Sequence, residues 1–207
     1  MTERSGFSRR GFLKGLGAAA VTGPAGIAGV ALAAKADEDA AAVPLLGPGP
    51  VPVRLDVNGK VHELRIEPRV TLLDALRDHA GVTGPKEVCD RGACGGCTVL
   101  LGDTPVCACM TLAIDVGDRK VTTAEGLCGP DGAPSDLQQQ FVAKDALQCG
   151  YCTCGMVTAA EGLLRSKSVL SPDEVRAGLS GNLCRCGTYT RIVEAVIATS
   201  ALRRKGK

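Results

Sequence analysis

Two cysteine-containing stretches decide the fold of this chain: Gln148-Cys149-Gly150-Tyr151-Cys152 and Gly181-Asn182-Leu183-Cys184-Arg185-Cys186-Gly187. The first has C-x2-C spacing and the second C-x-C, and 31 residues separate Cys152 from Cys184. A C-x-C pair is poorly placed to form a disulfide with itself, because disulfide geometry is narrow. Four thiolates from two loops therefore predict a metal centre. The intervening sequence contains two helical patterns, so we expect this centre where helix ends meet.

The composition limits the class of protein. The 207 residues allow one or two domains, and the eleven cysteines fall in clusters rather than the even scatter of a small disulfide scaffold. Three Phe, two Tyr and no Trp mean that the core consists mainly of aliphatic residues. The net charge of +2 and the lack of a basic stripe argue against nucleic-acid binding.

The N-terminus has the features of a targeting segment. Ser8-Arg9-Arg10-Gly11-Phe12-Leu13-Lys14 resembles a twin-arginine export signal, and small residues allow cleavage after Ala33 or Ala36. The Gly- and Ala-rich run that follows is too broken to predict a membrane span, so no stable membrane insertion is expected; an uncleaved anchor is the alternative. We therefore expect a signal peptide at residues 1–36, a linker or extended arm at 37–50, and a periplasmic protein.

Export in the folded state suits a metal protein. The resemblance to twin-arginine signals implies that the chain folds before it crosses the membrane. Its thiolates are then loaded with metal in the reducing cytoplasm, before they meet an oxidising compartment.

A β-hairpin followed by a helix is predicted next. Apolar residues alternate on both sides of Asn58-Gly59, a strong hairpin signal: Val53, Leu55, Val57, Val61, Leu64 and Ile66. Thr71 to Arg77 then predicts a helix with Thr71 as its N-cap and an apolar face that includes Leu72 and Leu76. This order of elements is typical of the start of a β-grasp domain.

A second cysteine loop follows this helix. Cys89-Asp90-Arg91-Gly92-Ala93-Cys94-Gly95-Gly96-Cys97 has the C-x4-C-x2-C spacing of the plant-type ferredoxin [2Fe–2S] loop. Glycine backbone can approach a cluster closely and direct N–H groups at its sulfurs. A hairpin over residues 98–106 then leads to Cys107 and Cys109, both of which are available as a fourth ligand.

Four helices are predicted near the C-terminus. Ser135 with Gln138 forms a capping box for the first, which is expected to bury Leu137, Phe141 and Val142. The second follows Cys152 and has Met156, Ala160, Leu163 and Leu164 on one face. The third begins Ser171-Pro172-Asp173-Glu174, and the last begins near Thr188 with Ile192, Val193, Val196 and Ile197 facing inward.

These motifs together resemble the small iron–sulfur subunit of the xanthine oxidase family of molybdenum hydroxylases, over about residues 53–198. The resemblance rests on Cys89 to Cys109, on Val121-Thr122-Thr123-Ala124-Glu125-Gly126-Leu127 and on the two C-terminal cysteine stretches. It implies an α+β fold, with an N-terminal β-grasp (plant-type ferredoxin-like) domain at 51–127 and an all-α four-helix-bundle [2Fe–2S] domain at 134–202. With the export signal, periplasmic aldehyde oxidoreductases are the most similar members.

The resemblance also implies the metal ligands. In this family eleven residues separate the third ligand of the first cluster from the fourth, which selects Cys109 over Cys107. Two [2Fe–2S] clusters are implied, with these ligands: Cys89, Cys94, Cys97 and Cys109 for the first, and Cys149, Cys152, Cys184 and Cys186 for the second. Cys107, Cys128 and Cys154 remain as small buried or loop thiols.

The implied function is electron transfer within a larger enzyme. A partner large subunit would hold the molybdopterin cofactor, with Gln148 and Cys186 nearest the pterin, and an FAD-binding subunit or a cytochrome would accept the electrons. No catalytic site is expected on this chain alone. The alternatives are structural zinc, a free-standing ferredoxin-like carrier, and a subunit of an enzyme that oxidises N-heterocycles. Zinc does not account for the glycine-rich C-x4-C-x2-C loop.

Overall fold

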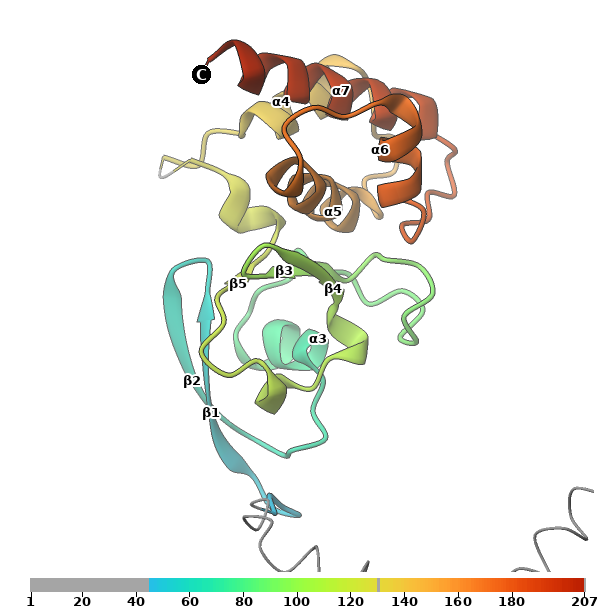
Figure 1. The fold of residues 1–207 in the computed structure, drawn as a ribbon. Coiled ribbons are helices and arrows are strands. Elements are labelled where there is room, and N and C mark those ends of the chain that lie inside the picture. Colours follow the sequence, from blue (N-terminus) through green and yellow to red (C-terminus); the bar gives the residue numbers. More distant parts are fainter. Residues whose placement is uncertain (1–44, 130, 207) are drawn as a thin grey trace, which may run out of the picture. The chain divides into compact units, whose positions relative to one another are not determined.

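The computed structural model describes residues 45–129 and 131–206 (Figure 1). The predicted signal peptide and residues 37–44 of the predicted linker lie outside these ranges. Residues 45–50 contain no helix or strand. In the part of the chain that the structure describes, no helix combines the length and the apolar character that crossing a membrane requires.

The predicted hairpin is confirmed. Strand β1 (Val51–Val57) pairs antiparallel with β2 (Lys60–Ile66), and Val57 lies opposite Lys60 across the turn. The two turn residues have left-handed backbone angles, with φ of 54° at Asn58 and 80° at Gly59. This is the conformation that a tight two-residue hairpin requires, and that Asn-Gly adopts at low cost.

The hairpin belongs to a five-stranded mixed sheet with the order β2-β1-β5-β3-β4. β3 (Thr98–Leu101) and β4 (Thr104–Cys107) form the second predicted hairpin. β5 (Val121–Thr122) lies between the two hairpins, parallel to β1 and antiparallel to β3. The sheet therefore brings the end of β4 back beside the start of β3, and Thr98 pairs with Cys107.

The helical segment after the first hairpin differs in part from the prediction. Thr71 caps α3 (Leu72–Asp74) as expected, because its hydroxyl accepts a hydrogen bond from the Asp74 N–H at 3.1 Å. The chain then widens into a π-helical turn, Ala75–His79, instead of continuing as a regular α-helix. Leu72 and Leu76 are nonetheless fully buried in the core under the sheet.

The four predicted C-terminal helices are present: α4 (Asp136–Ala143), α5 (Thr153–Ser166), α6 (Pro172–Gly178) and α7 (Tyr189–Lys205). The predicted capping box forms at Ser135 with Gln138, and a second capping box forms at Ser171 with Glu174. One prediction is wrong, since Val142 is 69% exposed. Helix α4 ends at Ala143. Its buried residues are Leu137 and Phe141, which belong to the core of the helices.

The described residues form two hydrophobic cores, one with members from Val51 to Val121 and one with members from Leu127 to Ile197. We call the parts of the chain around them the sheet half and the helical half. Helix α5 packs on the β3–β4 hairpin of the sheet half (Figure 1). Contact is close at Gly162, where an added Cβ would lie 2.5 Å from Pro105 Cγ and 3.0 Å from Leu100 Cδ2. Residues from Leu46 onward accordingly form one compact unit.

Candidate metal centres

The first four predicted ligands come together at the end of the sheet half. Cys89 and Cys94 lie in the loop before β3, Cys97 directly precedes that strand, and Cys109 lies in a short 3-10 turn after β4. The β3–β4 hairpin is what returns the chain to this loop. We call these four cysteines the first thiol set. Its buried members are Cys97 and Cys109.

The first thiol set is arranged as two pairs. Within the set, Cys89 lies beside Cys94, and Cys97 lies beside Cys109. The Arg91 backbone N–H stabilises the thiolate of the half-buried Cys89 and lowers the pKa of this thiol to about 7. Burial raises the pKa of Cys109 to about 11. A metal bound here must displace the proton of Cys109, because thiolates and not thiols are the ligands.

Backbone N–H groups point at two of these sulfurs. Gly92 N lies 3.2 Å from Cys109 Sγ, and Gly96 N lies 3.4 Å from Cys94 Sγ. An added Cβ on Gly92 would lie 2.8 Å from Met110 Cγ, so the loop needs glycine to approach the 3-10 turn this closely. These contacts agree with the role that the sequence predicts for the loop glycines. Such donors stabilise negative charge on cluster sulfurs.

Cys107 is a fifth thiol beside the first set. It interacts with Cys97, as Cys109 does, but its own Sγ lies 4.0 Å from the carbonyl oxygen of Gly92. Cys109 Sγ accepts from Gly92 N at the shorter distance of 3.2 Å. Cys109 Sγ thus accepts a backbone hydrogen bond, whereas Cys107 Sγ does not. This difference favours Cys109 over Cys107 as the fourth ligand. The structure contains both cysteines, and Cys128, as free thiols.

The second four predicted ligands converge between helix ends. Cys149 and Cys152 precede α5, with Cys152 at its N-cap, and Cys184 and Cys186 lie between α6 and α7. We call these the second thiol set. The N-terminus of α5 therefore adjoins the set, as the sequence predicts, and its free N–H groups favour negative charge there.

The second thiol set is also paired. Cys149 is the neighbour of Cys186, and Cys152 is the neighbour of Cys184. Burial raises the pKa of Cys152 to about 12. Burial also acts to raise the pKa of Cys184, but hydrogen bonds from Thr188 outweigh it and lower the value to about 7. Thr188 Oγ1 lies 3.3 Å from Cys184 Sγ.

The paired arrangement fits a two-iron cluster. A [2Fe–2S] cluster takes two thiolates on each iron, so pairs of thiols suffice. Structural zinc takes four ligands on one ion. The all-thiol donor sets also match the preference of iron–sulfur clusters.

One side of the second set faces the surface. Gln148, Cys149 and Cys186 are exposed, whereas Cys184 is buried and Cys152 is half-buried. A small cavity of about 110 Å³ lies here, between the two thiol sets. It is lined by Val88, Cys94, Gly96, Cys149, Tyr151, Cys152, Leu183 and Arg185.

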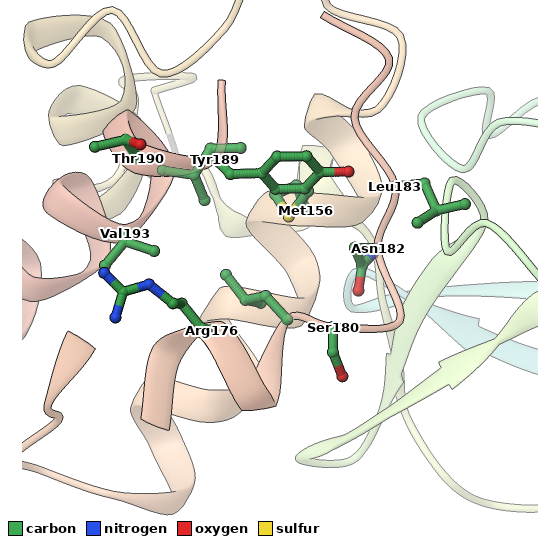
Figure 2. A pocket seen from close by; sticks show the side chains of 10 residues that line it. Met156, Arg176, Ser180, Asn182, Leu183, Tyr189, Thr190 and Val193 are labelled. Atoms are coloured by element: carbon green, nitrogen blue, oxygen red, sulfur yellow. The ribbon is translucent and has the colours of Figure 1, made fainter. Parts of the chain in front are cut away.

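A larger cavity of about 330 Å³ adjoins the second set from inside the helical half (Figure 2). Met156 and Tyr189 project into it, and none of its lining residues is a cysteine. Tyr189 connects the cavity to the second set, because its hydroxyl oxygen accepts a hydrogen bond from the Cys184 N–H at 2.7 Å. The cavity is a neighbour of the metal centre and not the centre itself.

Sequence reasoning missed the residues that support the thiols. Thr188 and Tyr189 hold Cys184, and Asn182 contacts the first set's loop from the helical half. The sequence does contain one signal for Asn182, because it is a polar residue in the short segment just before the predicted ligand Cys184. Its partner is 87 residues away in the sequence, however, and no local pattern identifies it.

Known proteins share these features. Residues 123–197 match the family model described as "[2Fe-2S] binding domain". The chain is 40% identical over 174 residues to the aldehyde oxidoreductase iron-sulfur-binding subunit PaoA of Escherichia coli O157:H7, covering 76% of each chain. It is 42% identical over 146 residues to the nicotinate dehydrogenase small FeS subunit of Eubacterium barkeri, covering 70% of this chain and 92% of the relative.

Solved structures agree. Quinoline 2-oxidoreductase from Pseudomonas putida 86 superposes with a TM-score of 0.72 at 39% identity, over 76% of this chain and 98% of the other. The aldehyde oxidoreductase from Desulfovibrio desulfuricans gives a TM-score of 0.71 at 36% identity, over 75% of this chain and 17% of that longer chain. The two curated relatives are iron–sulfur subunits of molybdenum hydroxylase complexes. The chain therefore belongs to the iron–sulfur small subunits of the xanthine oxidase family of molybdenum hydroxylases, as its cysteine pattern predicts.

Proposed function

We propose that this chain is the electron-transfer subunit of an exported molybdenum hydroxylase and holds two [2Fe–2S] clusters. The observation that carries the proposal is the presence of two separate sets of four thiols, each divided into two pairs. The first set would hold one cluster and the second set the other. When bound, each cluster supplies a one-electron carrier, which this chain otherwise lacks.

The proposal includes a division into two domains. A plant-type ferredoxin-like β-grasp domain would cover residues 51–127 and hold the first cluster. A helical-bundle domain would cover residues 134–202 and hold the second. Two separate hydrophobic cores support this division. Each thiol set is placed mainly by the elements around one core, so each domain would build its own site.

The exposed side of the second thiol set is the proposed docking face for the molybdopterin-binding large subunit. Three large apolar side chains surround it and are more than half exposed: Val88, Tyr151 and Leu183. Exposed apolar groups gathered at one place are typical of an interaction surface. Gln148 and Cys186 would then lie nearest the pterin, because both are exposed on this side.

An aldehyde is the proposed substrate of the complex. The match to the PaoA subunit extends over 174 residues, whereas the match to the nicotinate dehydrogenase subunit extends over 146. The second candidate is an N-heterocycle, which the similar identity to the nicotinate dehydrogenase subunit and to the quinoline enzyme favours. The substrate pocket would belong to the large subunit, and an FAD-binding subunit or a cytochrome would accept the electrons.

Export to the periplasm is proposed from the sequence alone. The heptapeptide Ser8–Lys14 supports a twin-arginine signal, with residues 1–36 removed. Loading of the two thiol sets before export would protect these eight cysteines from disulfide exchange.

Metal analysis of the purified chain tests the proposal. We expect about four iron and about four acid-labile sulfide per chain, because each [2Fe–2S] cluster takes four cysteines. Reduction should produce two distinguishable rhombic EPR signals. A colourless zinc protein would contradict the assignment. Affinity purification of the tagged chain from its native cells distinguishes a hydroxylase subunit from a free-standing carrier. A free-standing carrier would be isolated without a molybdenum-containing subunit.

A further inference from the structure

The loop before Cys184 contacts the loop of the first thiol set. Leu183 N donates a hydrogen bond to the carbonyl oxygen of Cys94 at 2.9 Å. The side-chain amide of Asn182 donates to the carbonyl oxygen of Gly95 at 2.9 Å and lies 3.2 Å from Thr98 Oγ1. Asn182 is only 7% exposed. A segment of the helical half therefore makes three polar contacts with the first set's loop.

Asn182 acts on the part of the loop with the least freedom. Gly95 lies between two predicted ligands, Cys94 and Cys97, and has a left-handed φ of 69°. An added Cβ at Gly95 would lie 2.5 Å from the Asn182 amide nitrogen and 2.7 Å from the Gly181 carbonyl oxygen. The helical half thus encloses this turn, and Asn182 supplies its only side-chain amide donor among the described residues.

The turn is also covered from α5. An added Cβ on Gly155 would lie 2.1 Å from the Gly95 carbonyl oxygen, so this oxygen points at the helix and has little space. It accepts from Thr98 Oγ1 at 2.8 Å, from the Asn182 amide at 2.9 Å and from the Thr98 backbone N–H at 3.2 Å. A buried carbonyl oxygen that loses its donors costs free energy, because no water replaces them.

We infer that Asn182, although it belongs to the helical half, is a positioning residue for the first cluster. The inference rests on the proposed function. The Gly95 carbonyl and the Gly96 N–H belong to one planar peptide group. By holding the carbonyl oxygen, the Asn182 amide therefore sets the orientation of the Gly96 N–H, whose nitrogen lies 3.4 Å from Cys94 Sγ. Hydrogen bonds to cluster sulfurs raise the reduction potential, because they stabilise the more negative reduced state.

The purely structural alternative makes a different prediction. If Asn182 only joins the two halves, its removal lowers thermal stability but leaves the EPR signal and potential of a correctly loaded first cluster unchanged. The hydrogen bond from Leu183 N–H to Cys94 O joins two main-chain groups, so we expect it to form in every Asn182 variant. A change confined to the first cluster would therefore report the side-chain amide itself.

The experiment is an EPR-monitored redox titration of the purified iron-loaded chain. Asn182→Ala should shift the midpoint potential of the first cluster downward and alter its g-values, while the second cluster keeps both. Asn182→Asp keeps the size but replaces the donor with an acceptor that faces Gly95 O, so it should shift the first cluster at least as far. Asp103→Ala is the matched control. It removes the 3.0 Å ion pair to Arg165, which also joins the two halves, and contacts neither thiol set.

Thr98→Val provides a second variant if Asn182→Ala does not fold. It removes the other side-chain donor to Gly95 O and should shift the first cluster in the same direction. The inference is overturned if the Asn182 variants leave the potential and g-values of the first cluster unchanged, or if Asn182→Asp behaves like the wild type. It is also overturned if the potential of the second cluster alone shifts, or if both potentials shift equally. Failure of the proposed function is distinguishable, because the wild-type chain would then lack the two EPR signals.

Discussion

Arg203, in the last turn of α7, forms a bidentate ion pair with Asp136 in the first turn of α4. Nε lies 2.7 Å from Oδ2, and Nη2 lies 2.7 Å from Oδ1. Arg203 also contacts Glu161 of α5 at 2.8 Å, and this carboxylate is nearly buried. One guanidinium therefore joins three helices of the bundle and holds the last turn of α7 against α4 and α5.

Arg203→Ala is expected to lower the free energy of unfolding by about 1–3 kcal/mol, because it leaves the buried Glu161 with Arg165 as its remaining partner. Urea titration followed by circular dichroism measures this. Arg204→Ala, one residue further along and exposed, should change the value by less than about 0.5 kcal/mol. Equal effects of the two substitutions would contradict a specific role for Arg203.

The effect of Arg203 should also depend on pH. Its hydrogen bonds lower the pKa of Asp136, so the carboxylate is ionised in the folded protein at pH values where it is partly protonated in the unfolded chain. The stabilisation is fully present above the unfolded value of about 3.9 and is lost as the pH falls through the lowered pKa. The stability difference between wild type and Arg203→Ala should therefore be constant from about pH 8 to about pH 5 and shrink below about pH 4. A difference that grows in acid would be inconsistent with this ion pair.

Cys109→Ser is expected to abolish or distort the first cluster. Total iron should fall by about half, and one EPR signal should be lost, because the second thiol set is intact. Cys107→Ser and Cys128→Ser should retain both signals. If Cys107→Ser removes the signal and Cys109→Ser does not, the ligand assignment is wrong.

Tyr151→Asp and Leu183→Asp are expected to weaken binding of the large subunit by about tenfold or more, because each places a charge in the proposed docking face. Affinity between the purified subunits measures this. Val142→Asp is the matched control, since Val142 is exposed on α4 and does not line the cavity between the thiol sets. Undiminished binding of both docking-face variants would exclude this surface.

Arg9→Lys combined with Arg10→Lys is expected to leave a folded, iron-loaded precursor in the cytoplasm, since the signal is read by a receptor and not by the fold. Immunoblots of cell fractions measure this. Arg4→Lys, outside the heptapeptide, should be exported normally. Normal periplasmic accumulation of the double variant would indicate another route.

Local patterns predicted the secondary structure well where neighbouring residues determine it. Asn58-Gly59 predicted the first hairpin because left-handed backbone angles favour these residues, and Ser135 and Ser171 predicted two helix starts because capping acts within one turn. The same reasoning failed for Val142 and for the π-helical turn at Ala75–His79. Both depend on how the chain packs afterwards, which spacing along one helix does not contain.

The sequence by itself determined that eight thiols occur in two groups with the spacings of iron–sulfur sites, and it thereby determined the family. Only the tertiary structure decided which thiols face one another. Cys149 pairs with Cys186, and Cys152 with Cys184, because α5, α6 and α7 pack on one core and bring two distant loops together. The contact of Asn182 with Gly95 has the same origin. Ligand spacing is a local property of the chain, whereas thiol pairing and the positioning of the loops result from long-range packing of the two cores.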